Sequence, residues 1–156
     1  MDYTSVDRLI ASGHTISVME SCTGGLIAAI LTDRSGASEI FPGGFVTYSN
    51  RAKIMQGVPA GIIDRYGVYS GETAEAMAHA CAAAYGTEIG VGVTGSLGRK
   101  DPANPDSISG RVHYCILYQG KAVRDMLVIP GEITERREMK QLVAERIIKE
   151  IVTLVC

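Results

Sequence analysis

The sequence predicts a single α/β domain over residues 1–156, with a mixed sheet between two layers of helices. Two observations favour this fold class. Strand-like and helix-like segments alternate through the first two thirds of the chain, which is typical of parallel strands joined by helices. Two strand-like segments then flank a short turn, which predicts an antiparallel hairpin in the same sheet. A chain of 156 residues, 46% of them hydrophobic, is long enough to bury one core.

The first half of the chain contains two expected strands and several short helices. In order, we expect helix 2–12, strand 14–20, helix 26–33, a loop over 35–42, strand 44–49, and short helices 50–55 and 59–67. The first helix is expected to start near Asp2 and to end at Gly13. Asn50 is a suitable N-cap, and Pro59 suits a first helical turn. The unit formed by a strand, a glycine-containing turn and a helix is how an α/β fold opens.

The second half predicts the longest helices and the hairpin. The expected segments are helix 70–85, strand 88–94, a long loop over 95–110, strands 111–118 and 122–129, and helix 134–155. The many alanines of the first of these helices imply close packing against a sheet, and Gly86 ends it. The apolar strand bounded by glycines is typical of a buried central strand. The last helix has apolar residues along one face.

Composition and charge exclude several functional classes. Fifteen basic and 17 acidic residues give a net charge of −2 with no basic run, so we expect no nucleic-acid partner. No apolar stretch is long enough to cross a bilayer, and the first residues do not resemble a signal peptide, so we expect a cytoplasmic protein without a membrane partner. The four cysteines and three histidines are dispersed, so we expect neither a bound metal nor another cofactor.

The segment Glu20-Ser21-Cys22-Thr23-Gly24-Gly25 lies where the first strand passes into a helix. Ligand sites in open α/β sheets lie at the carboxyl ends of strands. The free N–H groups of a helix start suit an oxyanion or a phosphate, and Ser21 or Cys22 could act as a nucleophile. A tight turn with Thr23 as the helix cap explains the same residues.

Two further strand ends carry polar residues. After the second strand, Lys53 could act as a base if partial burial lowered its pKa, and Tyr48 could donate a proton. The alternative for Lys53 is a solvated residue on a short helix. After the apolar strand, the segment 94–98 offers hydroxyls and glycine-freed backbone that can bind phosphate or sugar oxygens. Three such ends on neighbouring strands predict one shared pocket.

Three motifs occur in a characteristic order and spacing: ESCTGG, GGFVTYSNRAK and GVTGS. In combination they resemble the C-terminal domain of the competence/damage-inducible CinA family, the nicotinamide-nucleotide amidohydrolases. The resemblance runs from about residue 18 to the last helix. The larger family members carry an additional N-terminal domain, and this chain resembles the stand-alone form.

The resemblance implies hydrolysis of the carboxamide of nicotinamide mononucleotide, giving nicotinate mononucleotide and ammonia without a metal. It implies that Ser21 is the nucleophile, Lys53 its base and Tyr48 a helper. Arg137 matches a family arginine that could hold the substrate phosphate through two hydrogen bonds. The residues expected to bind the substrate are Glu20, Thr23, Gly24, Gly25, Asn50, Thr94, Gly95, Ser96 and Arg137.

The loop after the third motif departs from the family pattern. It reads TGSLGRKDPANPDSISGRV, without the family's glycine pair, its Gly-Pro and its Lys-Pro. A GDR motif expected before the last helix reads Gly131-Glu132-Ile133. The catalytic segments are therefore retained while the binding segments are altered. Two alternatives follow: a nucleotide-binding domain without catalysis, and hydrolysis of a different amide.

Two further expectations concern the nucleophile and the assembly. Ser21 is preferred over Cys22 because a reactive thiol needs a lowered pKa, and no histidine lies within the three motifs. A lysine base works only when neutral, so activity should rise with pH. A hairpin strand leaves a sheet edge, and two helices have wide apolar faces, so we expect a homodimer.

Overall fold

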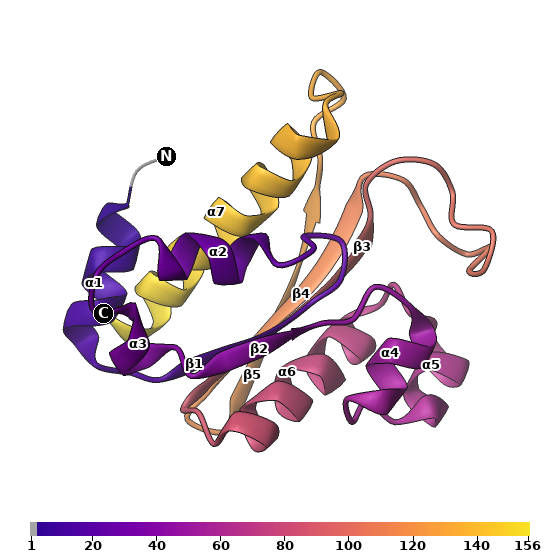
Figure 1. Cartoon of the computed structure of the whole chain (residues 1–156). Coiled ribbons are helices and arrows are strands. Elements are labelled where there is room, and N and C mark those ends of the chain that lie inside the picture. Colours follow the sequence, from indigo (N-terminus) through magenta and orange to yellow (C-terminus); the bar gives the residue numbers. More distant parts are fainter. Residues whose placement is uncertain (1–2) are drawn as a thin grey trace.

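Five strands form one mixed sheet in the computed structural model, which describes residues 3–156 (Figure 1). The strands are β1 (Ile16–Glu20), β2 (Gly43–Val46), β3 (Ile89–Ser96), β4 (Arg111–Tyr118) and β5 (Lys121–Val128). Their order across the sheet is β2-β1-β3-β4-β5. Strand β1 runs parallel to β2 and β3, and the β4–β5 hairpin continues the sheet in antiparallel pairing. The predicted mixed sheet is therefore confirmed.

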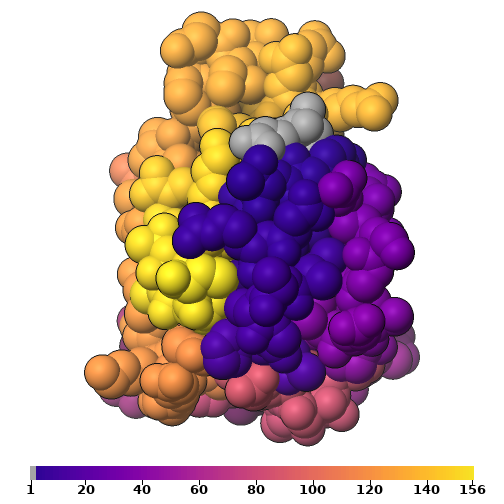
Figure 2. All heavy atoms as spheres, turned by 90° about the vertical axis from the view of Figure 1, so that its left-hand side faces the viewer, coloured from indigo at the N-terminus to yellow at the C-terminus, as the bar shows by residue number. Residues whose placement is uncertain are grey.

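Helices cover both faces of this sheet. They are α1 (Thr4–Ser12), α2 (Leu26–Thr32), α3 (Ala37–Ile40), α4 (Asn50–Met55), α5 (Ala60–Tyr66), α6 (Gly71–Tyr85) and α7 (Arg136–Val155). Helices α1, α2, α3 and α7 lie on one face, and α4, α5 and α6 lie on the other (Figure 1). Figure 2 shows α1, in indigo, against α7, in yellow, so the first and last helices lie side by side on one face. The predicted three-layer arrangement is confirmed.

Most elements lie within a few residues of their predicted positions, with one exception. Helix α3 occupies part of the segment expected to be a loop. This single turn follows Gly36, whose backbone is left-handed, and buries Ala37 and Ile40. Four residues are too few to show a helical period, so no pattern in the sequence indicated this helix. The helix start expected near Asp2 lies outside the described residues.

Glycines let helix α6 approach the central strand closely. All eight residues of β3 are buried. A Cβ on Gly90 would lie 2.3 Å from the Ala78 carbonyl oxygen, and one on Gly92 would lie 2.0 Å from that of Ala74. The alanine-rich face of α6 therefore packs directly on the backbone of β3, which explains the predicted close packing. Within residues 3–156, no helix combines the length and apolar character needed to cross a bilayer.

Candidate active site

The candidate site lies beyond the carboxyl ends of three neighbouring strands. Ser21 directly follows β1, Lys53 lies on the helix after β2, and Gly95 lies near the end of β3. Because β1 lies between β2 and β3 in the sheet, the chain segments that follow these strands meet at one edge. The structure therefore brings the three motifs together around Ser21.

A buried amine and a buried hydroxyl form the centre of the site. The Nζ of Lys53 donates a hydrogen bond of 2.9 Å to the Oγ of Ser21 and another of 2.8 Å to the Thr47 carbonyl. Lys53 is 2% exposed and Ser21 is 5% exposed. The interpretation of Lys53 as a solvated surface residue is therefore wrong. The N-cap of α4 is Ser49 rather than the expected Asn50, and its Oγ accepts a hydrogen bond from the Ala52 N–H.

Burial changes the acid–base properties of Lys53. It lowers the pKa of the amine from 10.5 to about 8, and the negative charge of Asp101 only partly opposes this effect. Desolvation penalises the charged form of an amine and therefore lowers its pKa, as a lysine base requires. A neutral amine is therefore accessible near neutral pH, next to a hydroxyl from which it can accept a proton.

The thiol of Cys22 has the opposite character. Burial raises its pKa to about 12, and the nearby carboxylate of Glu20 adds to the rise. A thiol is a good nucleophile only as the thiolate. Cys22 is therefore fully protonated near neutral pH, so its environment does not favour nucleophilic attack.

The carboxylate of Glu20 occupies the start of helix α2. It is fully buried and accepts hydrogen bonds from the N–H groups of Gly25, Ile27 and Ala28, at 2.9–3.1 Å. The hydroxyl of Thr23 donates a further bond of 2.5 Å to the same carboxylate. The expectation that this helix start offers free N–H groups to an oxyanion or phosphate is therefore wrong, because an internal anion already binds there.

Two cavities adjoin Ser21, with volumes of about 200 Å³ and 350 Å³. Both are lined by Ser21, Tyr48, Tyr69 and Asp101. The smaller cavity is also lined by Cys22, Gly95, Ser96, Leu97, Gly98, Arg99 and Arg136. The larger one is also lined by Ser49, Asn50, Arg51, Lys53, Val68, Ala103 and Asn104. Within residues 3–156, no three His, Cys, Asp or Glu side chains gather in a way that could hold a metal ion.

The residues predicted from sequence fall into two groups. Besides Ser21 and Lys53, the predicted residues that line a cavity are Tyr48, Asn50, Gly95 and Ser96. Those that line neither are Glu20, Thr23, Gly24, Gly25, Thr94 and Arg137. The hydroxyl of Thr94 is buried and donates to the Val68 carbonyl, at 3.0 Å. Arg136, one position before the predicted arginine, lines the smaller cavity and donates to the Tyr48 hydroxyl, at 2.8 Å.

Sequence reasoning missed the contribution of Tyr69 and of two residues of the 95–110 loop, Asp101 and Asn104. The hydroxyl of Tyr69 donates to the Asp101 carboxylate, at 2.7 Å, and the Asn104 amide donates to the same oxygen, at 2.8 Å. Asn104 also exchanges hydrogen bonds with Asn50, which ties the loop to α4. The Asp-Pro pair at 101–102 favours a turn, and the Ala103 N–H does bond back to Asp101, but no pattern indicates which way that side chain faces.

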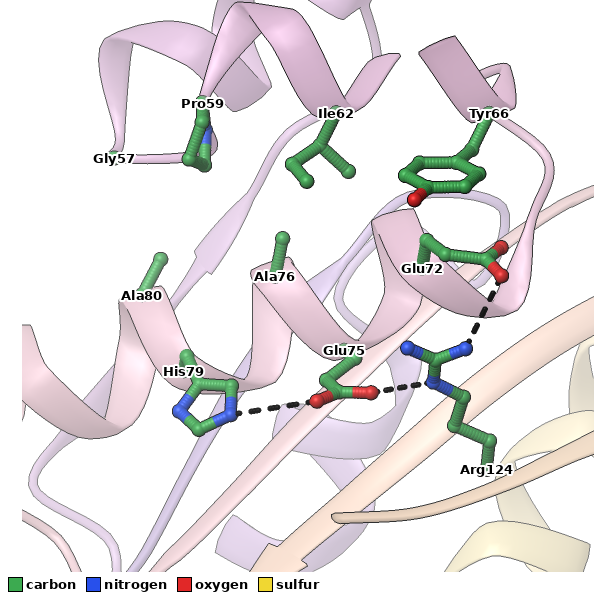
Figure 3. A pocket seen from close by; sticks show the side chains of 10 residues that line it. All are labelled: Gly57, Pro59, Ile62, Tyr66, Glu72, Glu75, Ala76, His79, Ala80 and Arg124. Carbon is green, nitrogen blue, oxygen red and sulfur yellow. Dashed lines mark hydrogen bonds and ion pairs between the residues drawn. The ribbon is translucent and has the colours of Figure 1, made fainter.

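A third cavity lies away from Ser21, between α5 and α6 (Figure 3). Its volume is about 540 Å³. Apolar side chains, including Ile62 and Tyr66, form one wall. Along the opposite wall, Arg124 forms ion pairs with Glu72 and Glu75. This groove shares no lining residue with the two cavities around Ser21, so its size alone does not locate the site.

A family model described as the CinA C-terminal domain matches residues 1–154. The chain belongs to this family. CinA-like proteins from Mycobacterium sp. (strain MCS) and Mycolicibacterium vanbaalenii are 35% and 37% identical to it over 95% and 97% of its length. The chain spans 36% and 37% of the length of these two relatives. The resemblance inferred from the three motifs is therefore confirmed.

Solved structures of CinA proteins have the same fold. A competence/damage inducible protein from Agrobacterium tumefaciens superposes with a TM-score of 0.84 at 30% identity, covering 96% of this chain and 93% of that one. A CinA superfamily protein from Klebsiella pneumoniae superposes with a TM-score of 0.88 at 21% identity, covering 97% of this chain and 94% of the other. The second likeness concerns the fold alone.

Proposed function

We propose that this CinA-family domain is an amidohydrolase that converts nicotinamide mononucleotide to nicotinate mononucleotide and ammonia. The observation that carries the proposal is the buried hydrogen bond between the Lys53 amine and the Ser21 hydroxyl. A nucleophile paired with a base of lowered pKa, beside a cavity, is the arrangement that serine–lysine hydrolysis requires. The family resemblance of the motifs supplies the substrate.

In the first half of the reaction, neutral Lys53 accepts the hydroxyl proton of Ser21 while the Oγ bonds to the amide carbon. The resulting tetrahedral adduct breaks its C–N bond as the Lys53 ammonium gives that proton to the leaving nitrogen. Ammonia departs and the acyl group stays on Ser21 as an ester. The carbonyl of Thr47 holds the amine in position throughout, through its 2.8 Å hydrogen bond.

In the second half, water replaces ammonia. Neutral Lys53 takes a proton from the water, whose oxygen bonds to the ester carbon, and the bond from that carbon to the Ser21 Oγ then breaks. The Oγ recovers the proton from Lys53, the carboxylic acid product releases its remaining proton to solvent, and nicotinate mononucleotide leaves as a carboxylate. Tyr48 assists as a hydrogen-bond donor. Its hydroxyl oxygen accepts a hydrogen bond from Arg136, so the hydroxyl proton of Tyr48 remains free to be directed at the substrate.

The guanidinium groups of the smaller cavity bind the phosphate. Arg136 and Arg99 both line it. A guanidinium binds a phosphate through paired hydrogen bonds, so these two residues take the role that the sequence assigned to Arg137. Ser96 and the backbone of Gly95 line the same cavity and offer further polar groups to the nucleotide.

Incubation of the purified chain with nicotinamide mononucleotide tests the proposal, with ammonia and nicotinate mononucleotide both quantified. Turnover is expected in the unaltered chain and its loss in Ser21→Ala. The matched control is Ser38→Ala, because Ser38 is exposed on α3 and lines neither cavity. Equal rates in Ser21→Ala and Ser38→Ala would contradict the assignment of the nucleophile.

The second candidate function is nucleotide binding without catalysis. The altered 95–110 loop favours it, since its residues line both cavities without the family's glycine pattern. Calorimetric titration with nicotinamide mononucleotide separates the two functions. Tight binding without turnover would favour the binding domain, whereas turnover of other amides in a substrate panel would indicate a different substrate.

A further inference from the structure

Asp101 introduces a negative charge into a site that otherwise has positive charges. Among the described residues, it is the only acidic side chain that lines either cavity, and it lines both. Its carboxylate accepts hydrogen bonds from the Tyr69 hydroxyl, the Asn104 amide and the Ala103 N–H, at 2.7–2.9 Å. All three donors are neutral, so they fix the carboxylate in place without cancelling its charge.

In the described part of the chain, this carboxylate takes part in no ion pair. Within residues 3–156, no Lys, Arg or His nitrogen lies within the 4.0 Å of an ion pair with Asp101. The hydrogen bonds from Asn104 and Tyr69 lower the pKa of Asp101, so the group is ionised at neutral pH. Lys53 directs its amine at Ser21 and Thr47 instead, and it must be neutral to act as a base.

The surroundings of Asp101 suit a cationic ring. The aromatic side chains of Tyr48 and Tyr69 line the same two cavities and can provide ring faces for a cation, while the carboxylate attracts it over a few ångströms. Arg99 and Arg136 line the smaller cavity, where they attract an anion. The site thus presents both signs of charge next to the nucleophile, which is the complement of a zwitterionic ligand.

We propose that Asp101 is a specificity-determining residue that recognises a positive charge on the ring bearing the scissile amide. The substrate class is then a zwitterion, with an anionic phosphate held by the arginines and a cationic ring beside Asp101. This inference rests on the proposed amidohydrolase function and deepens it. In nicotinamide mononucleotide the ring is a pyridinium cation, whereas its 1,4-dihydro form carries the same amide and phosphate on a neutral ring.

The test compares the Kd of these two nucleotides in a Ser21→Ala background, where no turnover interferes. Asp101→Asn removes the charge and keeps the size of the side chain. We expect it to weaken binding of the pyridinium form about tenfold or more, and to change binding of the dihydro form less than about twofold. The matched control is Asp106→Asn, because Asp106 is exposed in the same loop and lines neither cavity.

Each outcome of this titration bears on the inference. If Asp101→Asn weakens both nucleotides equally, or neither, the inference is overturned. Asp101→Ser also removes the charge and replaces the Asn variant if that variant does not fold. Turnover is measured separately in the protein with Ser21 intact. Absence of turnover there, together with charge-selective binding, would contradict the proposed catalysis while supporting the role of Asp101.

Discussion

Lys53→Met replaces a buried amine with an apolar side chain of similar length. The pKa of this amine is 10.5 in an unfolded chain and about 8 in the folded one. Between these two pH values the unfolded chain binds a proton that the folded chain has lost, so the free energy of unfolding rises with pH. Below pH 8 both states are protonated and the full cost of burying the charge is present. Above pH 10.5 both are neutral and that cost has vanished.

The magnitude follows from the size of the pKa change. One pKa unit corresponds to about 1.4 kcal/mol, so lowering the pKa of Lys53 from 10.5 to about 8 corresponds to about 3.5 kcal/mol in full, most of which is realised by pH 10.5. We therefore expect the unfolding free energy of the unaltered chain, minus that of Lys53→Met, to increase by about 3 kcal/mol between about pH 7 and pH 10.5. Other groups titrate in both proteins, so their effects cancel in this difference.

Urea unfolding followed by circular dichroism at a series of pH values measures this difference. Lys149→Met is a suitable control, because Lys149 is exposed on α7. Its difference curve should be flat over the same range. A flat curve for Lys53→Met as well would refute the reasoning, since it would mean that burial does not depress the pKa of Lys53.

The remaining predictions concern activity, packing and assembly. The kcat/KM for nicotinamide mononucleotide should rise about tenfold between about pH 7 and pH 9, as the neutral fraction of Lys53 grows; a profile that falls over this range would exclude a lysine base. Ser21→Ala should lower kcat at least about a thousandfold in the ammonia assay, while Cys22→Ser keeps most of it; the reverse would assign the nucleophile to the thiol. Gly92→Ala should lower the unfolding free energy by about 1–3 kcal/mol in urea, because its Cβ would lie 2.0 Å from a carbonyl oxygen of α6. Gly61→Ala is the comparison: nothing lies within 4 Å of the added Cβ, and alanine is favoured over glycine in helix α5, so it should not lower the unfolding free energy. Light scattering after size exclusion should give about 33 kDa, twice the 16.6 kDa of the chain, and a value near 16.6 kDa would disprove the homodimer.

The sequence could predict that the chain segments carrying Ser21 and Lys53 meet at one edge of the sheet, because topology brings them there. The pairing of the two side chains was implied by the family resemblance. The two residues are 32 positions apart, yet each follows a strand whose carboxyl end lies at the same edge of the sheet. Strand and helix patterns are local, and the parallel arrangement follows from their alternation. The burial of Lys53 could not be predicted from the strand and helix pattern, because it depends on how α4 packs rather than on the sequence of α4.

The parts of the site that were missed depend on irregular backbone or on helical phase. The loop that carries Asp101 has no period, so its side-chain directions follow from individual hydrogen bonds. A shift of one position decides which arginine at the start of α7 lines the smaller cavity, because each step along a helix turns the side chain by about 100°. Arg136 therefore reaches the cavity while Arg137 does not line it, although both lie in the first turn of α7.

The carboxylate of Glu20 affects how Ser21, the proposed nucleophile, is held before any ligand binds. In many phosphate-binding turns the ligand itself supplies the negative charge around which the backbone N–H groups gather. Here the chain supplies that charge, so the turn that carries Ser21 is folded around its own internal anion. Such a turn loses little conformational entropy on binding, and the free energy of contact with the substrate remains available for stabilising the transition state.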